Sequence, residues 1–320
     1  DPIANLHEWE GVEEPWQFVA ACEEMYHCLI KRDRKTTSLM IAIDATCSGL
    51  QILAGLARDK STAELVNVIP ANKPQDAYKV VAEKSKPHIP VVLHDVWDRK
   101  CTKRTCLTIP YNAKPYSNRT YIKDALKEKG VEITKEDLTQ TVKAVRDAME
   151  VVVPGPMAVM RWIEKEVAKT IKRGVDKISW VTPSGFVVSQ RYMKKEVVEI
   201  KMKLLGRCEI RVATDDTNEV DLLGHKNGTA PNLIHSLDAN TLHFTVDKFD
   251  KPIALIHDSV LCRATDMTEL STKVREVYMH LFAEHDYLND FAKAIEAESK
   301  PPIIGDLVPS DVINSTYFFC

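Results

Sequence analysis

The spacing of apolar residues predicts a chain made largely of helices. Over residues 13–31 apolar side chains, among them Trp16 and Leu29, recur at helical spacing, which is typical of a helix with one face in the core. Thr134 stands where it can cap the start of a helix that ends before Pro154. Further helices are predicted over residues 48–59, 75–86, 134–152, 157–173 and 268–283, and residues 97–123 follow a helical pattern as well.

Short apolar runs and alternating segments predict the strands. Residues 38–44 fit a buried strand that ends in Asp44, and residues 253–256 fit a strand that leads into a turn with Asp258. Residues 197–213 alternate between apolar and charged side chains, as in a β-hairpin with one basic-leaning face. Two further short strands are predicted over residues 178–181 and 186–189. The mixture indicates an α/β (α+β) fold class.

Composition narrows the possible classes of protein. The 320 residues are 44% hydrophobic and 28% charged, as in ordinary globular domains. No apolar stretch approaches the roughly 20 residues that span a bilayer, so we expect no membrane association. The net charge of −3 argues against a protein that coats nucleic acid indiscriminately. The 8 cysteines show no CxxC spacing, which argues against a zinc site and favours a reducing compartment.

Two aspartates mark the ends of apolar segments. Asp44 and Asp258 are far apart in the sequence, and each follows a strand-like run. Two carboxylates brought together repel each other unless a cation compensates them, and Mg²⁺ prefers oxygen ligands. Two such ions can activate a hydroxyl and stabilise a pyrophosphate leaving group. The alternative is that each aspartate is only a cap or turn residue, which is the commoner case.

A basic segment lies between the two aspartates. Residues 99–123 contain seven Lys or Arg and no acidic residue. Arg99, Lys103 and Tyr111 fall on one helical stripe, so the two cations can grip a triphosphate while the ring stacks on a base. The alternative is a solvated charged face, which the lack of compensating acids disfavours.

Three segments together resemble a known family. The segment from Asp44 to Gln51 resembles motif A of the single-subunit RNA polymerases of phages and mitochondria. The segment from Arg99 to Tyr111 is similar to their motif B, and residues 256–259 are similar to motif C. The resemblance implies a right-hand polymerase fold with a mostly helical fingers subdomain. Residues 1–60 and 236–320 would form the palm, and residues 61–235 the fingers.

The resemblance also implies roles for individual residues. Two Mg²⁺ ions would bind Asp44, Asp258 and the backbone carbonyl of Ala45. Arg99 and Lys103 would bind the incoming triphosphate, with Lys103 as a proton donor to pyrophosphate. Tyr111 and His235 would sense the ribose 2′-hydroxyl. The residues expected to support the site are Tyr78, Arg104, His257 and the terminal carboxylate of Cys320.

The implied partners are a DNA template and promoter, an RNA product and nucleoside triphosphates. The hairpin 197–213 lies where the family carries a promoter-reading loop, and its candidate contacts are Lys201, Lys203, Arg207 and Arg211. A merely exposed hairpin is the alternative. Because few residues precede motif A, we expect a second polypeptide to supply the N-terminal domain and thumb. If phage-encoded, the enzyme would act in the cytoplasm of an infected bacterium.

Three positions depart from the family pattern. Ala45 and Asn112 each replace a glycine that family members usually carry. Pro110 cannot donate a backbone hydrogen bond, so the motif B helix is expected to kink or end just before Tyr111.

Other functions remain to be weighed against an RNA polymerase. A DNA polymerase of the same palm family would carry glutamate at the positions that Gly49 and Ser259 occupy in this chain. Gly49 has no side chain and so leaves room for ribose. A non-catalytic DNA-binding subunit would have no use for the paired aspartates. An unrelated metal-dependent hydrolase would need further clustered ligands, and only His257 is adjacent.

Overall fold

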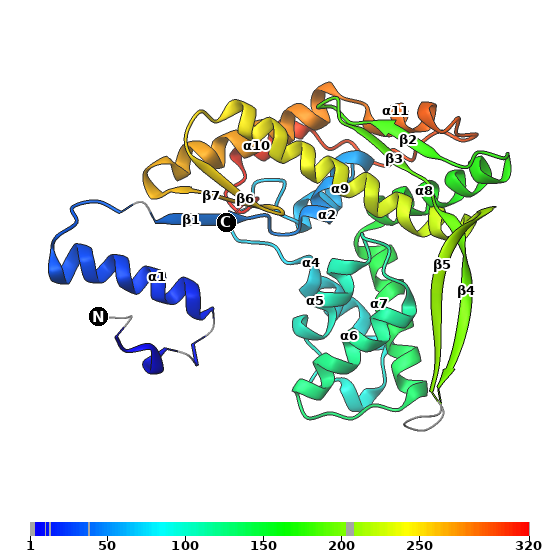
Figure 1. Cartoon of the computed structure of the whole chain (residues 1–320), viewed down its shortest axis with the longest axis horizontal. Helices are drawn as coiled ribbons and strands as arrows, with labels where there is room; N and C mark the ends of the chain where they lie inside the picture. The colour runs from blue at the N-terminus through cyan, green and yellow to red at the C-terminus, as the bar shows by residue number, and fades with distance from the viewer. Residues whose placement is uncertain (1–3, 10, 13, 38, 203–207, 320) are drawn as a thin grey trace.

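The computed structural model, which describes residues 4–9, 11–12, 14–37, 39–202 and 208–319, consists mainly of helices together with three small antiparallel sheets (Figure 1). The mixed fold class is therefore confirmed. Within these ranges no helix has the length and apolar character to cross a membrane.

A three-stranded sheet brings distant segments together. Strand β7 (Ser259–Arg263) lies between β1 (Met40–Asp44) and β6 (Ile253–Ile256), and both pairings are antiparallel. The register places Asp44 opposite Ser259. The tight turn that joins β6 to β7 contains His257, whose φ of 54° is left-handed, and Asp258. Asp44 and Asp258 therefore lie at the same end of the sheet.

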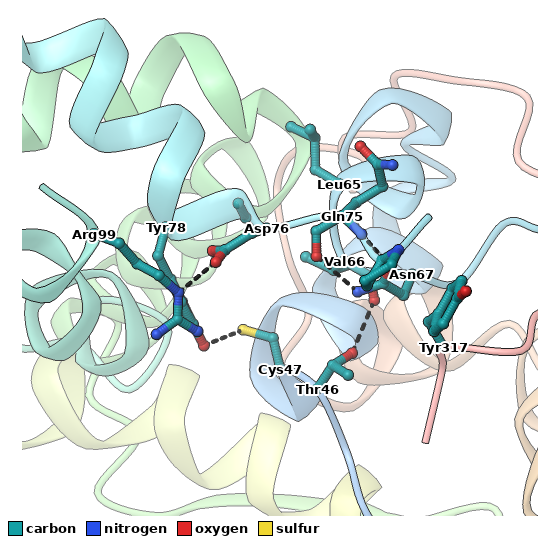
Figure 2. Close-up of a pocket in the computed structure, with 12 residues that line it drawn as sticks. Thr46, Cys47, Leu65, Val66, Asn67, Gln75, Asp76, Tyr78, Arg99 and Tyr317 are labelled. Carbon is teal, nitrogen blue, oxygen red and sulfur yellow. Dashed lines mark hydrogen bonds and ion pairs between the residues drawn. The ribbon is translucent and has the colours of Figure 1, made fainter. Parts of the chain in front are cut away.

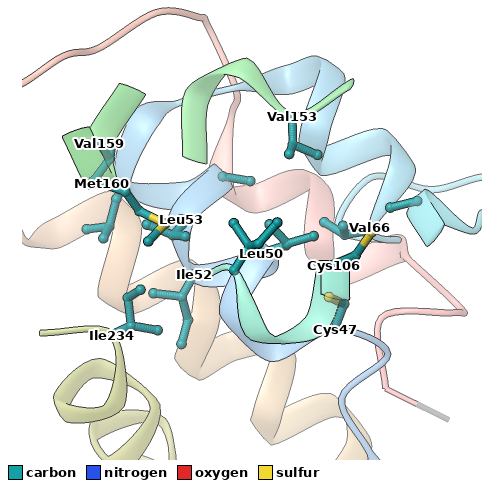
Figure 3. Close-up of a cluster of buried hydrophobic side chains, with 14 of the residues drawn as sticks. Cys47, Leu50, Ile52, Leu53, Val66, Cys106, Val153, Val159, Met160 and Ile234 are labelled. Atoms are coloured by element: carbon teal, nitrogen blue, oxygen red, sulfur yellow. The ribbon is translucent and has the colours of Figure 1, made fainter. Parts of the chain in front are cut away.

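The core is built around helix α2 (Ser48–Ala57), in which every residue is buried. Figure 3 shows its Leu50 and Leu53 among side chains from α8 (Pro154–Lys172) and α9 (Leu222–Lys248). Helix α10 (Met267–Glu284) approaches so closely that a Cβ at Gly55 would lie 2.8 Å from the Phe282 ring. Two shorter helices are α3 (Lys60–Leu65) and α11 (Tyr287–Ala294).

A separate helical lobe carries the basic segment (Figure 1). The lobe consists of α4 (Ala77–Ser85), α5 (Arg99–Thr108), α6 (Pro115–Glu128) and α7 (Lys135–Val152). Three of its four helices, α4, α5 and α7, begin at side-chain caps, because Asp76, Asp98 and Thr134 each accept a hydrogen bond from a backbone N–H in the first turn. The cap predicted at Thr134 is confirmed.

The basic segment is two helices and not one. Helix α5 ends at Thr108, and a turn precedes α6, which begins at Pro115. The expected helix end before Tyr111 is confirmed, and its cause is that Pro110 has no N–H to continue the helix.

Helix α9 has no counterpart among the predicted elements. It runs for 27 residues although it contains Gly224, Gly228 and Pro231, which disfavour a helix. Its apolar residues form no single stripe, since neighbours cover it on several sides. Gly228 is needed for close packing, because a Cβ there would lie 2.8 Å from the Tyr192 hydroxyl.

The two short strands predicted over residues 178–181 and 186–189 form β2 (Ile178–Val181) and β3 (Val187–Gln190), which pair with each other in a hairpin. The hairpin predicted over residues 197–213 is confirmed, with β4 (Met193–Met202) against β5 (Cys208–Val220). The second hairpin extends from the body as a long arm, beside the helical lobe (Figure 1). Its tip, residues 203–207, lies outside the described residues.

Two expectations of burial are wrong. Helix α1 (Pro15–Met25) and the following π-helix η2 (Tyr26–Lys31) contain no buried residue, and 78% of Trp16 is exposed. Figure 1 shows this segment apart from the body, on the far side of β1. Strand β1 is not buried either, since 43% of Ile41 is exposed. The spacing of apolar residues shows which face of a helix or strand is apolar, but it does not show that another part of the same chain packs against that face.

Candidate active site

The two predicted carboxylates meet at one end of the three-stranded sheet. Asp44 Oδ1 accepts a hydrogen bond of 3.1 Å from the Ala45 N–H. Burial, and then the negative charge of Asp258, raises the pKa of Asp44. Within the described ranges neither aspartate forms an ion pair, and the Ala45 carbonyl accepts no hydrogen bond. Two neighbouring carboxylates and a carbonyl with no basic partner among the described residues are oxygen donors of the kind that Mg²⁺ prefers.

Asp238 on α9 is a third carboxylate that we did not predict from the sequence. Burial, then the charges of Asp258 and Asp44, raises the pKa of Asp238 to about 7. In the part of the chain that the structure describes, no three His, Cys, Asp or Glu side chains are close enough together to hold a metal. The only available signal was its position one helical turn after His235, and the helix itself was not predicted.

Tyr111 connects the basic segment to this end of the sheet. Its ring stacks on His235 with centroids 4.6 Å apart and an interplanar angle of 15°. Its hydroxyl lies 3.3 Å from Ser48 Oγ. A Cβ at Gly49 would be only 3.0 Å from that hydroxyl, so the absent side chain makes room for the Tyr111 ring. Burial raises the pKa of Tyr111 to about 12.

The residue after Tyr111 shows why glycine is usual at this position. Asn112 has a φ of 63°, in the left-handed region that glycine adopts freely and asparagine tolerates. Its Nδ2 donates to the Asn227 carbonyl of α9 at 3.1 Å. Its Oδ1 accepts from Lys114 Nζ at 2.6 Å, and Lys114 also pairs with Glu164 at 2.7 Å. Asparagine therefore preserves the turn and adds a link to α9.

Arg99 and Tyr78 line a cavity of about 300 Å³ next to the turn that follows Asp44 (Figure 2). Arg99 Nε donates to Asp76, and its guanidinium lies over the Tyr78 ring at 5.4 Å from the centroid. Burial raises the pKa of Tyr78, whose hydroxyl donates to Cys47 Sγ at 3.0 Å.

The other basic residues of α5 differ in their contacts. Lys103 is exposed and its side chain has no partner among the described residues. Arg104 lies over the Tyr121 ring at 4.4 Å and 3.9 Å from the Asp124 carboxylate. Residues 99–123 contain no acid of their own, but Asp76 and Asp124 from other segments pair with Arg99 and Arg104.

The C-terminal tail lies against the turn after Asp44. Phe319 forms an antiparallel bridge with Ala45, and the Thr46 N–H donates to the Phe318 carbonyl at 3.4 Å. Cys320 itself lies outside the described residues.

The candidate DNA contacts of the hairpin are described only in part. Lys203 and Arg207 lie outside the described residues. For Lys201 and Arg211 the structure gives the backbone pairing, opposite Glu209 and Glu199, and not the side chains.

Asp44 and Asp258 lie at neighbouring strand ends, and Arg99 and Lys103 lie on helix α5. Comparison with known proteins gives the family. The family model for DNA-dependent RNA polymerase matches residues 1–319, and the chain belongs to this family.

Three relatives illustrate the similarity. Over its whole length, the chain is 28% identical to a mitochondrial DNA-directed RNA polymerase of Mus musculus and 27% identical to the DNA-directed RNA polymerase of Enterobacteria phage K11, with 100% of the chain aligned in both comparisons. It is 28% identical to the DNA-directed RNA polymerase of Pseudomonas phage phiKMV over 89% of its length. The matched region is 30%, 43% and 38% of these relatives, so the chain spans less than half of each.

Proposed function

We propose that this chain carries the nucleotidyl-transfer centre of a DNA-dependent RNA polymerase. The observation that carries the proposal is the strand register, which pairs Asp44 with Ser259 and so brings the carboxylates of motifs A and C to one sheet end. The family match supports the same reading. The palm would comprise residues 1–60 and 236–320 and the fingers residues 61–235, although α9 runs across the boundary at residue 235.

The metal site would be formed by Asp44, Asp258 and the Ala45 carbonyl. Two bound Mg²⁺ ions would lower the pKa of the RNA 3′-hydroxyl and neutralise charge on the leaving pyrophosphate. Arg99 would bind the triphosphate through its forked guanidinium, and exposed Lys103 would add a point charge and a proton for pyrophosphate.

Sugar selection would depend on the contact between Tyr111 and motif A. The Tyr111 hydroxyl lies close to Ser48 and Gly49, and its ring is held by His235. A hydroxyl fixed in this way can exchange hydrogen bonds with a ribose 2′-hydroxyl. Gly49 has no side chain that would exclude a ribose 2′-hydroxyl, so this position favours RNA over DNA as the product.

A second polypeptide is proposed to supply the thumb and N-terminal domain. Its contact surface would be the exposed apolar side chains of α1 and η2, such as Trp16 and Ile30, which is 73% exposed. Ile256, the last residue of β6, is a further exposed apolar side chain, at 60%. The β4–β5 arm would contact promoter DNA, and a phage-encoded enzyme would act in the cytoplasm of the infected bacterium.

An extension assay tests the proposal. The purified chain, alone and with proteins that co-purify from its native source, is given a primed RNA–DNA template, ribonucleotides and Mg²⁺. We expect extension with ribonucleotides in preference to deoxyribonucleotides, and loss of extension when EDTA removes the metal. Preference for deoxyribonucleotides would favour a DNA polymerase, and no extension under any condition would favour a non-catalytic subunit.

A further inference from the structure

We propose that Asp76 is a positioning residue for the nucleotide: its carboxylate holds Arg99 by Nε, so that the two terminal amino groups of the guanidinium are presented to the triphosphate. This inference rests on the proposed function, because it assumes that Arg99 binds a triphosphate.

Among the described residues, the guanidinium of Arg99 forms its hydrogen bond with Asp76 from Nε alone. Nε donates to Asp76 Oδ2, while the plane of the group lies over the Tyr78 ring. Nη1 and Nη2 have no partner within the described ranges. These two atoms form the forked edge that matches a phosphate geometrically. The side chain is 46% exposed, so a ligand can reach this edge.

Asp76 can orient Arg99 because it is itself fixed. Its Oδ1 accepts the Lys79 N–H at 3.1 Å and so caps α4, which leaves Oδ2 for the arginine. The preceding residue is anchored to the buried Asn67, whose Oδ1 accepts from the Gln75 N–H at 2.7 Å and whose Nδ2 donates to the Gln75 carbonyl at 3.0 Å. The carboxylate therefore has little freedom to follow the arginine.

The same helix start is connected to the metal-binding turn. Tyr78 donates from its hydroxyl to Cys47, three residues after Asp44, and its carbonyl accepts from Thr102 Oγ1 on α5 at 2.8 Å. Figure 2 shows Asp76, Tyr78 and Arg99 on one side of the cavity and Cys47 and Thr46 on the other. Arg99 is thus held at a set position relative to the carboxylates.

Two opposing contributions decide whether Asp76 strengthens or weakens the binding of nucleotide to Arg99. An unrestrained arginine loses rotamer entropy when it binds a phosphate, and a fixed one has lost it already. Against this, the negative charge of Asp76 weakens the attraction for an anion. If positioning dominates, removal of that charge weakens nucleotide binding. If competition dominates, removal strengthens it.

Asp76→Asn separates these cases, because asparagine caps helices as well as aspartate does and so preserves α4. In the complete polymerase we expect the KM for nucleotide to rise about 5- to 10-fold, with kcat changed far less, because an unrestrained arginine must lose its rotamer freedom when it binds the phosphate. Arg99→Ala should raise the KM at least as much, and Asp76→Asn should have no further effect in the Arg99→Ala background.

Asp98→Asn is a matched control. Asp98 caps α5 through Lys100 at 3.0 Å and pairs with Lys129 at 2.6 Å, so it has the same local chemistry, but its carboxylate pairs with Lys129 and not with the Arg99 guanidinium. We expect its KM to stay within about twofold of the wild type. A KM that is unchanged or lower in Asp76→Asn, while Arg99→Ala raises it, would overturn the positioning role and leave the proposed function intact. If Arg99→Ala has no effect on KM, the triphosphate assignment fails and this inference fails with it.

Discussion

The sheet side and the helical side of the candidate site differ in how their charges are satisfied. On the sheet side Asp44 and Asp258 have no ion pair among the described residues, and Asp238 adds a third negative charge nearby. On the helical side Arg99 is paired with Asp76. Lys103 is the exception, with no side-chain partner in the described part of the chain. The carboxylates therefore have no basic partner among the described residues, whereas Arg99 is already held in place by Asp76.

This difference has a physical origin in how each set of charges is assembled. The carboxylates come from strands far apart in the sequence and meet only through register, so the chain cannot avoid their repulsion once it folds. The cations follow one another on α5, where other helices can pair with them. A divalent cation would relieve the first side and a triphosphate would complete the second. Variants of each side test the contrast.

The largest effect is expected when one carboxylate loses its charge. Asp258→Asn should lower the rate of nucleotide addition by about three orders of magnitude or more, because two bound metals supply most of the charge stabilisation. Single-turnover extension of a primed RNA measures it. Asp250→Asn, at an exposed position before β6, is the control and should leave the rate unchanged. Near wild-type addition by Asp258→Asn would exclude the two-metal assignment.

A smaller effect is expected when the contact between Gly49 and Tyr111 is crowded by an added methyl group. In Gly49→Ala the new methyl group would lie 3.0 Å from the Tyr111 hydroxyl and 3.2 Å from Pro110 Cβ, so the turn must shift. We expect kcat/KM for ribonucleotides to fall about 10-fold, which corresponds to roughly 1.4 kcal/mol. Gly11→Ala, where a Cβ meets nothing within 4 Å, should have no effect. Equal activity of both variants would show that the Tyr111 contact is unimportant.

Removal of a single hydroxyl tests sugar selection. Tyr111→Phe keeps the ring on His235 but loses the hydroxyl, so discrimination against deoxyribonucleotides should fall about 5- to 10-fold, the value of one hydrogen bond. The measurement is the ratio of kcat/KM for ribo- and deoxyribonucleotides. Tyr116→Phe, at a residue that is 82% exposed, should leave the ratio unchanged. An unaltered ratio in Tyr111→Phe would remove this residue from sugar sensing.

The smallest effect concerns stability and not activity. Because the pKa of Asp238 is raised to about 7, the folded chain holds this proton more tightly than the unfolded chain does. Ionisation of Asp238 therefore lowers the stability of the wild type progressively between about pH 4 and pH 7, and the loss is complete above the folded pKa. In metal-free buffer Asp238→Asn should abolish this loss, with a gain of about 1–3 kcal/mol at pH 8 and little at pH 4.

Thermal unfolding at several pH values checks this prediction. Added Mg²⁺ should reduce the gain, since a bound cation relieves the same repulsion in the wild type. A gain that does not vary with pH would mean that the variant acts through packing and not through charge.

Local chemistry made part of this structure predictable. Thr134 caps its helix and Pro110 ends another, because capping and proline effects involve only the neighbouring three or four residues. The short apolar runs before Asp44 and Asp258 also form strands, as predicted from their composition. The hairpin 197–213 followed its alternating pattern and extended further at both ends.

Only the tertiary structure decided the rest. Helix α9 has no apolar stripe because it is covered on several sides, and it alone places Asp238 near the other carboxylates. The pairing of Asp76 with Arg99 depends on how α4 packs on α5. Helix α1 shows the reverse case: its sequence predicted a core-facing helix, but the described part of the chain buries none of its residues. A sequence pattern records what a segment must bury or pair with, whereas the partner is chosen by long-range packing.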